Sequence, residues 1–227
     1  MKILRGKDLE TPDPRALGQL RAAYRRCLVD VGTGDARFPY RWAREHPGDL
    51  AVGLDPVTAG FAKLAIKARR KPAKGGAPNL LLAAATVEDL PGPFRGWADQ
   101  VTVNFPWGSL LRAVIQPLPA TLEKLAALGR PGAEITLLLN TSIFSDADYA
   151  QRLGMPPLSE ERARRELAPT YRGCGIELGK IEPLAGSVPH RTTWGQRLVV
   201  GSSRSTLMLV GRISAGDEPP AAAAVPG

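Results

Sequence analysis

The chain has 227 residues, 44% of them hydrophobic and 23% charged, a formal net charge of +8 and a pI near 9.9. This length predicts one domain, with a core large enough to need neither disulfides nor a metal. The charge favours polyanionic partners, nucleic acid before an acidic membrane, over a basic surface that binds nothing. The amino-terminal residues are too charged for a signal peptide, and no apolar run approaches membrane-spanning length.

The two cysteines, Cys27 and Cys174, lie far apart and match no metal-binding or disulfide spacing. They indicate reduced thiols in a cytoplasmic protein, and no metal site is expected.

The first 26 residues predict an amino-terminal extension. Residues 2–5 favour a short strand, and Thr11-Pro-Asp-Pro14 favours the start of a helix that runs to about Arg26. Leu17, Leu20 and Tyr24 recur at helical spacing. We expect this segment to cover the strand that follows.

The central motif is an apolar run from Cys27 to Val31 that stops at Gly32-Thr-Gly34-Asp35, with a helix predicted from Pro39 to Glu45. A buried parallel strand, a tight glycine turn and a helix are typical of a nucleotide-type cofactor site. A dinucleotide loop would have a third glycine where Arg37 stands. Two acids, Asp30 and Asp35, suit the cationic groups of S-adenosylmethionine better than a pyrophosphate. The alternative is a strand–loop–helix unit that binds no cofactor.

The second predicted strand runs from Leu50 to Leu54 and ends at Asp55, where a ribose-binding carboxylate is expected. An N-cap for the next helix is an alternative role for Asp55. That helix is predicted over 56–71. Its end and the following loop hold more cations than the helix dipole requires, so phosphate contact is favoured over a solvated helix end. These cations are Lys67, Arg69, Arg70, Lys71 and Lys74.

Further strands are predicted over 79–85, 99–104 and 133–139, with helices over 110–115 and 119–129. Glu88 follows the third strand, where the amino group of an adenine is recognised. Strand alternating with helix predicts an α/β, Rossmann-like fold with a seven-stranded, mostly parallel sheet, closed by an antiparallel hairpin over 176–182 and 205–213. Ligands then lie beyond the carboxyl ends of the strands.

One methyltransferase-type domain is therefore expected over 1–213, with 1–26 as the extension. Segments 141–175 and 184–204 are predicted insertions that face the substrate. Residues 214–227 are rich in Pro, Ala and Gly and predict a disordered tail.

Two of the four tryptophans, Trp107 and Trp194, stand in predicted loops directly before a glycine. Each is as compatible with packing as with function, but a pair at one edge suits a flipped base held between two rings. Asn104-Phe-Pro-Trp107 is similar to the Asp/Asn/Ser-Pro-Pro-Tyr/Phe motif of amino-methyltransferases. Phe105 replaces the first proline of that motif, which argues against an exocyclic amine as target.

Five motifs occur in an order that identifies a family. They are Asp30-Val-Gly-Thr-Gly-Asp35, Gly53-Leu-Asp55-Pro56, Lys71-Pro-Ala-Lys-Gly-Gly76, Phe105-Pro-Trp-Gly-Ser-Leu-Leu111 and Thr193-Trp-Gly-Gln-Arg-Leu198. Together they resemble the aminoglycoside-resistance methyltransferases that modify N1 of adenine-1408 in 16S rRNA. The resemblance spans residues 1–214. One departure is Ala36, where the family often has glycine.

The resemblance implies S-adenosylmethionine as methyl donor, the assembled 30S subunit as substrate, and a target adenine flipped between Trp107 and Trp194. Phe105 and Pro106 complete the implied catalytic set. The implied cofactor residues are Asp30, Gly32, Gly34, Arg37, Asp55, Pro56, Val87, Glu88, Thr102, Asn104, Ser109 and Thr192. The implied RNA-binding residues are Lys67, Arg69, Arg70, Lys71, Lys74, Arg191, Arg197 and Arg204.

N1 of adenine carries a lone pair and no proton, so its methylation needs no general base. This agrees with His46 and His190, which stand in predicted loops with no partner in the pattern. Other hypotheses are a different RNA methyltransferase, acting on tRNA guanine or on the adenine amino group, and a non-catalytic ribosome-binding module. Nothing in the sequence indicates a dimer interface, so a monomer is expected.

Overall fold

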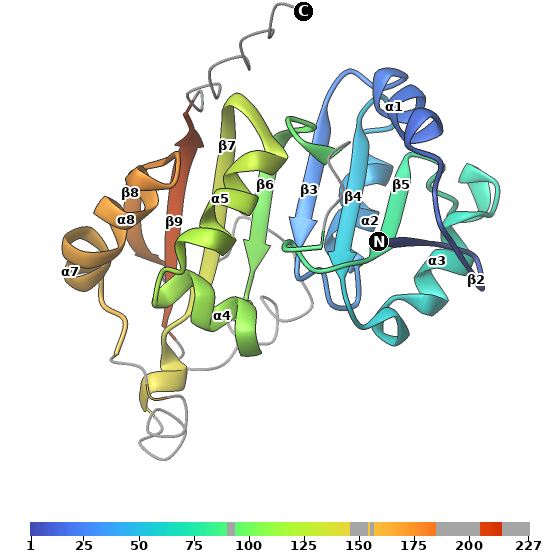
Figure 1. Cartoon of the computed structure of the whole chain (residues 1–227). Helices are drawn as coiled ribbons and strands as arrows, with labels where there is room; N and C mark the ends of the chain where they lie inside the picture. The colour runs from blue at the N-terminus through green and yellow to red at the C-terminus, as the bar shows by residue number, and fades with distance from the viewer. Residues whose placement is uncertain (90–93, 146–153, 155–156, 185–204, 215–227) are drawn as a thin grey trace, which may run out of the picture.

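The computed structural model describes residues 1–89, 94–145, 154, 157–184 and 205–214. Its centre is a mixed sheet of nine strands in the order β2-β1-β5-β4-β3-β6-β7-β9-β8 (Figure 1). The strands are β1 (Lys2–Arg5), β2 (Asp8–Glu10), β3 (Cys27–Val31), β4 (Leu50–Asp55), β5 (Leu80–Ala84), β6 (Ala98–Asn104), β7 (Gly129–Asn140), β8 (Ile176–Leu184) and β9 (Thr206–Ile213).

The expected α/β fold is confirmed, but the expected seven-stranded, mostly parallel sheet is not, because the sheet has nine strands and four of its eight strand pairings are antiparallel. Five strands, from β5 through β4, β3 and β6 to β7, are parallel, and β9 and β8 close that side as an antiparallel pair. On the other side β1 pairs antiparallel with β5, and β2 with β1. Ile3 and Leu4 of β1 are buried. The amino-terminal hairpin therefore extends the sheet, and β1 covers the edge that β5 would otherwise expose.

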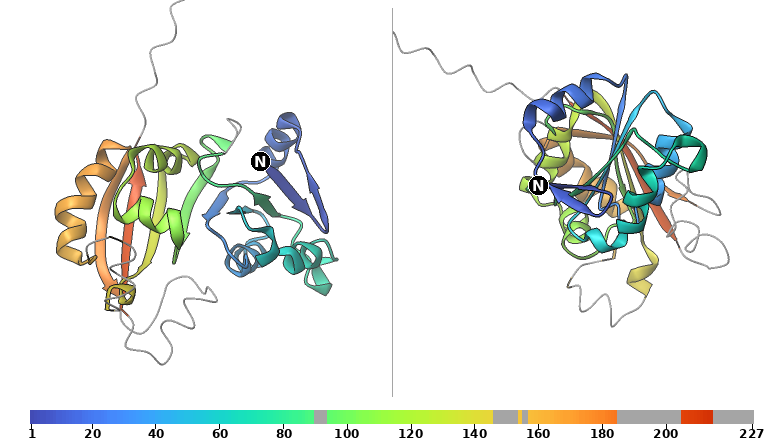
Figure 2. Two further views of the ribbon diagram at one scale, coloured as in Figure 1. Left: turned by 60° about the horizontal axis from the view of Figure 1, so that its bottom comes forward. Right: turned by 90° about the vertical axis from the view of Figure 1, so that its right-hand side faces the viewer.

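Helices cover both faces of the sheet, as two further views show (Figure 2). On one face, α1 (Pro14–Ala22), α4 (Gly108–Ile115), α5 (Pro119–Leu128) and α8 (Ala168–Gly173) enclose the main core. On the other face, α2 (Arg37–Glu45) and α3 (Ala62–Ala68) pack over β4 and β5. In β3, Cys27, Val29 and Val31 belong to the main core, as the alternation of side chains along a strand requires.

The predicted helix over 56–71 is divided. A 3-10 turn at Thr58–Gly60 precedes α3. A Cβ on Gly60 would lie 2.7 Å from the carbonyl oxygen of Gly34, so this turn packs directly against the loop after β3. The helix ends early because the amide of Ala77 donates to the carbonyl of Ala68 and turns the chain back.

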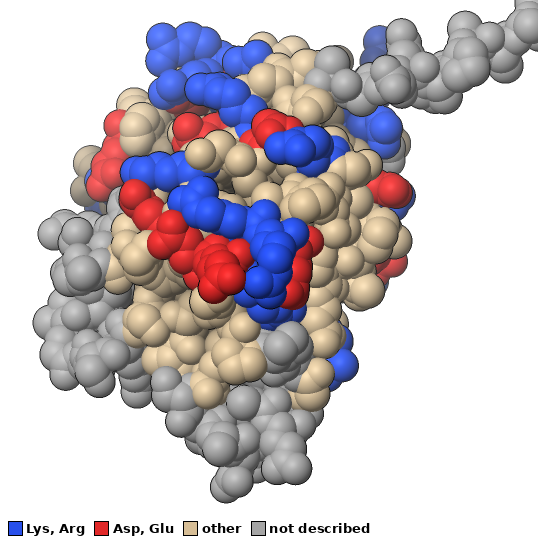
Figure 3. Space-filling view, turned by 90° about the vertical axis from the view of Figure 1, so that its left-hand side faces the viewer, with Lys and Arg blue, Asp and Glu red and all other residues tan. Residues whose placement is uncertain are grey.

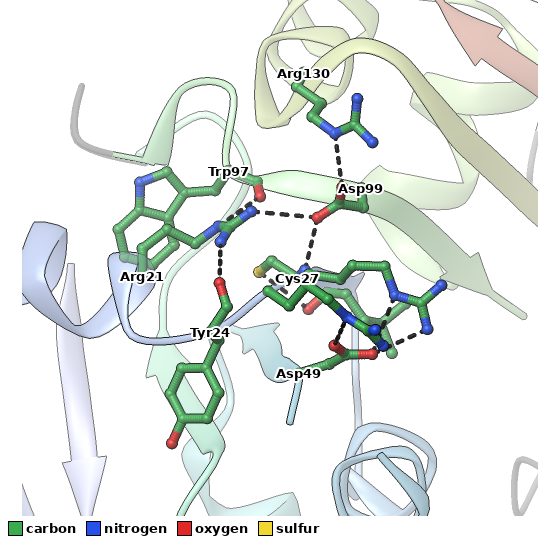
Figure 4. Close-up of polar contacts among 10 residues, drawn as sticks. Arg21, Tyr24, Cys27, Asp49, Trp97, Asp99 and Arg130 are labelled. Atoms are coloured by element: carbon green, nitrogen blue, oxygen red, sulfur yellow. Dashed lines mark hydrogen bonds and ion pairs between the residues drawn. The ribbon is translucent and has the colours of Figure 1, made fainter. Parts of the chain in front are cut away.

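A polar network joins the elements at the edge where the parallel strands begin (Figure 4). The Asp99 carboxylate accepts hydrogen bonds from the Cys27 amide at 2.8 Å, from Arg21 Nη2 at 3.2 Å and from Arg130 Nε at 2.6 Å. Arg21 also donates from Nε to the Trp97 carbonyl oxygen at 2.9 Å. These contacts fix α1 against the starts of β3, β6 and β7.

The chain between β7 and β8 ends in a helical run, α7 (Glu160–Arg162), a π-helical turn (Ala163–Leu167) and α8. It packs against α4, since the Tyr171 hydroxyl donates to the Val114 carbonyl at 2.9 Å and Arg162 Nη2 to that of Ile115 at 3.1 Å. The substrate-facing role expected for 141–175 stays a prediction. No helix among the described residues is both long and apolar enough to cross a bilayer.

Candidate cofactor and substrate site

A cavity of about 360 Å³ opens at the edge where the parallel strands end, which we call the carboxyl edge. This volume lies in the range of small-molecule sites, about 300–1,000 Å³. Its walls come from the ends of β3, β4 and β5 and from the start of α4. The lining residues are Val31, Gly32, Leu54, Asp55, Pro56, Val57, Ala85, Thr86, Val87, Glu88, Phe105, Pro106, Trp107, Gly108, Ser109 and Leu110.

The glycine loop after β3 is held by β4. The amides of Gly32 and Thr33 donate to the Leu54 carbonyl at 2.8 and 2.9 Å. Gly32 and Gly34 have φ of 71° and 57°, and a Cβ on Gly32 would lie 2.8 Å from Leu110 Cδ2. Side chains rarely adopt this backbone and would fill the approach to the cavity. Ala36 also has a positive φ, 53°, a conformation that glycine adopts more readily than alanine.

Asp55 lies at the tip of β4 and supports the same loop. Its Oδ2 accepts from the Gly34 amide at 2.9 Å, and its Oδ1 accepts from the Val57 amide at 2.8 Å. The contact with Val57 is an Asx-type turn, and the N-caps of the following 3-10 turn and of α3 are Val57 and Phe61, so the N-cap role considered for Asp55 is not observed. Each oxygen has a second lone pair, so the carboxylate can still accept a ligand hydroxyl.

Asp30 braces the loop from behind and does not belong to the lining residues of the described cavity. Its side chain is 2% exposed and accepts from Thr33 Oγ1 and Thr102 Oγ1 at 2.7 Å and from Asn104 Nδ2 at 2.8 Å. Burial raises the pKa of Asp30 to about 6, against the three hydrogen bonds, which favour the charged form. Thr102 and Asn104 therefore donate hydrogen bonds to Asp30 and lie outside the lining of the cavity.

The end of β5 contributes Val87, which is buried, and Glu88, which is exposed. Thr121 Oγ1, at the start of α5, donates to Glu88 Oε1 at 3.0 Å and orients this carboxylate. Arg37 does not line the cavity in the described part of the chain. It is exposed, and its Nε lies 3.5 Å from Asp35 Oδ2.

The loop after β6 presents one large ring to solvent at the cavity. Trp107, the residue before α4, is 45% exposed. Phe105 has φ of 51°, is 3% exposed, and packs with Leu138 and Met208, so its backbone lines the cavity while its ring is buried. The predicted residues Arg191, Thr192, Trp194, Arg197 and Arg204 lie outside the described residues.

The cations that follow α3 differ from those of the α7–α8 run. Lys67, Arg69, Arg70, Lys71 and Lys74 are all exposed, and no ion pair joins them to a carboxylate in the described ranges. On the α7–α8 run the basic side chains alternate with acidic ones, as the face in Figure 3 shows. The pairs there are Arg162–Glu166, Arg164–Glu160, Arg165–Glu161, Arg165–Glu166 and Arg172–Glu177.

Several lining residues were not predicted, among them Val31, Leu54, Val57 and Leu110. Val57 is an apolar side chain that is 63% exposed at the rim. Its position directly after Asp55-Pro56, past the end of β4, was the sequence feature that could have predicted its place in the lining. The others are strand-end or helix residues, and their apolar character is indistinguishable from that of core positions.

Comparison with known proteins agrees with this geometry. Residues 2–213 match the family model described as NpmA: 16S rRNA (adenine(1408)-N(1))-methyltransferase. The 16S rRNA (adenine(1408)-N(1))-methyltransferase of Streptoalloteichus tenebrarius is 38% identical over 94% of this chain and all of its own. A mutant of the corresponding Catenulisporales acidiphilia enzyme, solved with cosubstrate SAM, superposes with a TM-score of 0.86 at 35% identity, covering 96% of this chain and 99% of that one. The antibiotic-resistance methyltransferase Kmr superposes with a TM-score of 0.81 at 42% identity, covering 95% and 100%.

Proposed function

We propose, because this chain belongs to the 16S rRNA (adenine(1408)-N(1))-methyltransferase family, that it transfers a methyl group from S-adenosylmethionine to N1 of adenine-1408 in 16S rRNA. Methylation at this position would give resistance to aminoglycosides. The observation that carries the proposal is one cavity lined by Gly32, Asp55, Glu88 and Trp107, within a chain that matches the family over 2–213.

The lining residues fit this cofactor. When bound, S-adenosylmethionine supplies a methyl group that is attached to a sulfonium. Transfer of the methyl group turns the sulfonium into a neutral thioether, which is the leaving group. Gly32 keeps its backbone open to the cavity, Asp55 offers acceptor sites to ribose hydroxyls, and Glu88 offers an acceptor to the adenine amino group. Asp30 keeps the glycine loop in register with β6 through Thr33 and Thr102.

For the target base, catalysis would be a matter of positioning. N1 attacks with its in-plane lone pair, and no residue has to remove a proton. Trp107 would stack on one face of the flipped adenine, and Trp194 would stack on the other. Phe105 and Pro106 would present their backbone to the amino edge. The methylated base is cationic, and an indole face stabilises a cation.

The substrate would be the assembled 30S subunit, held through phosphates by the cations of 67–74 and of the 184–204 segment. Backbone contacts suit this substrate because the bases of duplex RNA are poorly accessible in its deep, narrow groove. We propose that the protein acts as a monomer in the cytoplasm, where this substrate is found.

The test is transfer of a radiolabelled methyl group from S-adenosylmethionine to isolated 30S subunits, with naked 16S rRNA in parallel. A methyl group on the Watson–Crick edge stops reverse transcriptase, so primer extension locates it. We expect a stop at adenine-1408 in 30S subunits alone. Methylation elsewhere, or no transfer despite calorimetric binding of S-adenosylmethionine, would overturn the proposal.

A further inference from the structure

The basic turn between α3 and β5 is attached to a different helix, α2. This turn comprises residues 71–76 and includes Lys71 and Lys74. The Tyr40 hydroxyl donates to the Gly75 carbonyl at 2.7 Å, and Arg44 Nη1 donates to the Pro72 carbonyl at 3.1 Å. Two side chains on successive turns of α2 therefore hold the backbone of a segment more than twenty-five residues along the chain.

The turn also has a defined internal geometry. The amides of Lys74 and Gly76 both donate to the Lys71 carbonyl, at 2.8 and 3.0 Å. Gly75 has φ of 83°, and a Cβ on Gly76 would lie 1.6 Å from the carbonyl oxygen of Arg70. This backbone is open only to glycine at both positions. The backbone that carries the exposed cations of this turn therefore has one defined conformation.

Tyr40 acts on a cation of this surface as well. Lys67 Nζ lies 5.1 Å from the centroid of the Tyr40 ring, within cation–π distance. The ring itself is 9% exposed, so a side chain anchored in the core meets both Lys67 and the carbonyl of Gly75. Neither Tyr40 nor Arg44 lines the cofactor cavity among the described residues.

We propose that Tyr40 and Arg44 are positioning residues for rRNA binding. They hold the 71–76 turn in the conformation that presents Lys71 and Lys74 to phosphates, beside Lys67, which contacts the Tyr40 ring. The conformational entropy of the turn is then lost on folding, and less is lost when the subunit binds. This inference rests on the proposed function, because it takes the cations of 67–74 to contact rRNA.

The test compares Tyr40→Phe with wild type. This change removes one hydrogen bond and keeps the ring, the cation–π contact and every cation. We expect 30S affinity to fall about two- to tenfold, the range of a single lost hydrogen bond. The KM for 30S subunits should rise by the same factor, with kcat and the KM for S-adenosylmethionine unchanged. The salt dependence of binding should keep its slope, because that slope counts phosphate contacts.

A second measurement does not depend on activity. Hydrogen exchange of the amides of 74–77 should be faster in Tyr40→Phe than in wild type, without rRNA present. Tyr24→Phe is the matched control, because the structure shows no hydrogen bond from that hydroxyl within the described chain, and it should behave as wild type in both assays.

The outcomes separate the two proposals. If Lys71→Gln with Lys74→Gln leaves 30S binding unchanged, the turn does not contact rRNA and the role proposed for these cations fails. If that pair weakens binding but Tyr40→Phe alters neither affinity nor exchange, the positioning role is wrong and the rRNA contact stands. A lower salt slope in Tyr40→Phe would also overturn it, since a phosphate contact itself would then have been lost.

Discussion

The buried carboxylate of Asp30 supports the glycine loop that lines the cavity. Asp30 joins the glycine loop to β6 through three hydrogen bonds, and its pKa is raised from 3.8 to about 6 by burial. Since the folded state binds this proton more tightly than the unfolded state does, the stability that the proton provides is complete below about pH 4. It is lost as the pH rises through about 6.

We expect Asp30→Asn to abolish this dependence, because an amide does not titrate in this pH range. Relative to wild type, the free energy of unfolding of the variant should rise by about 2–3 kcal/mol between pH 4 and pH 7.5, because only wild type must ionise a buried group. Affinity for S-adenosylmethionine should nevertheless fall at pH 7.5, because one amide oxygen replaces two carboxylate acceptors. Urea unfolding at both pH values and a calorimetric titration are the measurements. A stability difference that does not change with pH would contradict the raised pKa.

Trp107 is the exposed aromatic residue at the cavity, and its removal should affect the base and spare the cofactor. A stacked ring is worth about 1–3 kcal/mol per base, so Trp107→Ala should lower kcat/KM for 30S subunits by about 5- to 150-fold. Affinity for S-adenosylmethionine should stay within twofold of wild type. Leu118→Ala, an exposed apolar residue away from the cavity, is the control. Near-normal turnover of Trp107→Ala would rule out the stacking role.

Among the elements, two helical segments carry basic residues but differ in their partners. The α7–α8 run balances its arginines with glutamates one or four residues away or with Glu177 of β8, whereas the end of α3 and the 71–76 turn have no described acidic partner. Exposed ion pairs contribute little to stability, but they do neutralise a surface. We therefore expect phosphates to bind at the α3 end and the 71–76 turn in preference to the α7–α8 run.

Charge reversal should separate these two segments. Lys71→Glu should weaken 30S binding and lower the slope of log affinity against log salt by about 0.7–0.9 for the phosphate contact that it removes. Arg172→Glu, which breaks a pair with Glu177, should leave affinity and slope near their wild-type values. Filter binding over a range of salt concentrations measures both. Equal effects of the two variants would show that binding senses only net charge.

At the scale of the whole molecule, the edge where the parallel strands end and the edge where they begin have different roles. The carboxyl edge holds the cavity, and the opposite edge holds the network around Asp99, whose side chain is 12% exposed. This network connects α1 with β3, β6 and β7 and lies on the side of the sheet away from the cavity. We therefore expect it to contribute to stability and to leave the chemistry unaffected.

Asp99→Ala should lower the free energy of unfolding by about 2–4 kcal/mol, because the buried amide of Cys27 and the guanidinium of Arg21 lose their acceptor. Glu10→Ala, which breaks an exposed pair with Arg5, should cost less than about 1 kcal/mol. Chemical denaturation measures both values. An altered KM for S-adenosylmethionine in Asp99→Ala, with the fold intact, would show that the two edges are coupled.

The sequence by itself determined the order of strands and helices, the glycine loop and the acids at the strand ends. These features are local, because an apolar run that stops at Gly32 or Asp55 is defined by neighbouring residues in the sequence and does not depend on distant parts of the chain. The motif order also identified the family, and comparison confirmed it. The sequence predicted the parallel centre of the sheet but neither its mixed character nor its nine strands, because edge pairing of the amino-terminal hairpin depends on β5, which lies far along the chain.

Only the tertiary structure decided which of the predicted site residues face the cavity. Asp30, Thr102 and Asn104 turned out to brace the loop, and Phe105 to bury its ring, because a side chain's direction follows from the pleat and from its neighbours on other strands. The pairing of the arginines of the α7–α8 run with glutamates was likewise visible only in the structure. The anchoring of the 71–76 turn by Tyr40 had no sequence signal, since a hydroxyl and a carbonyl 35 residues apart meet only after folding.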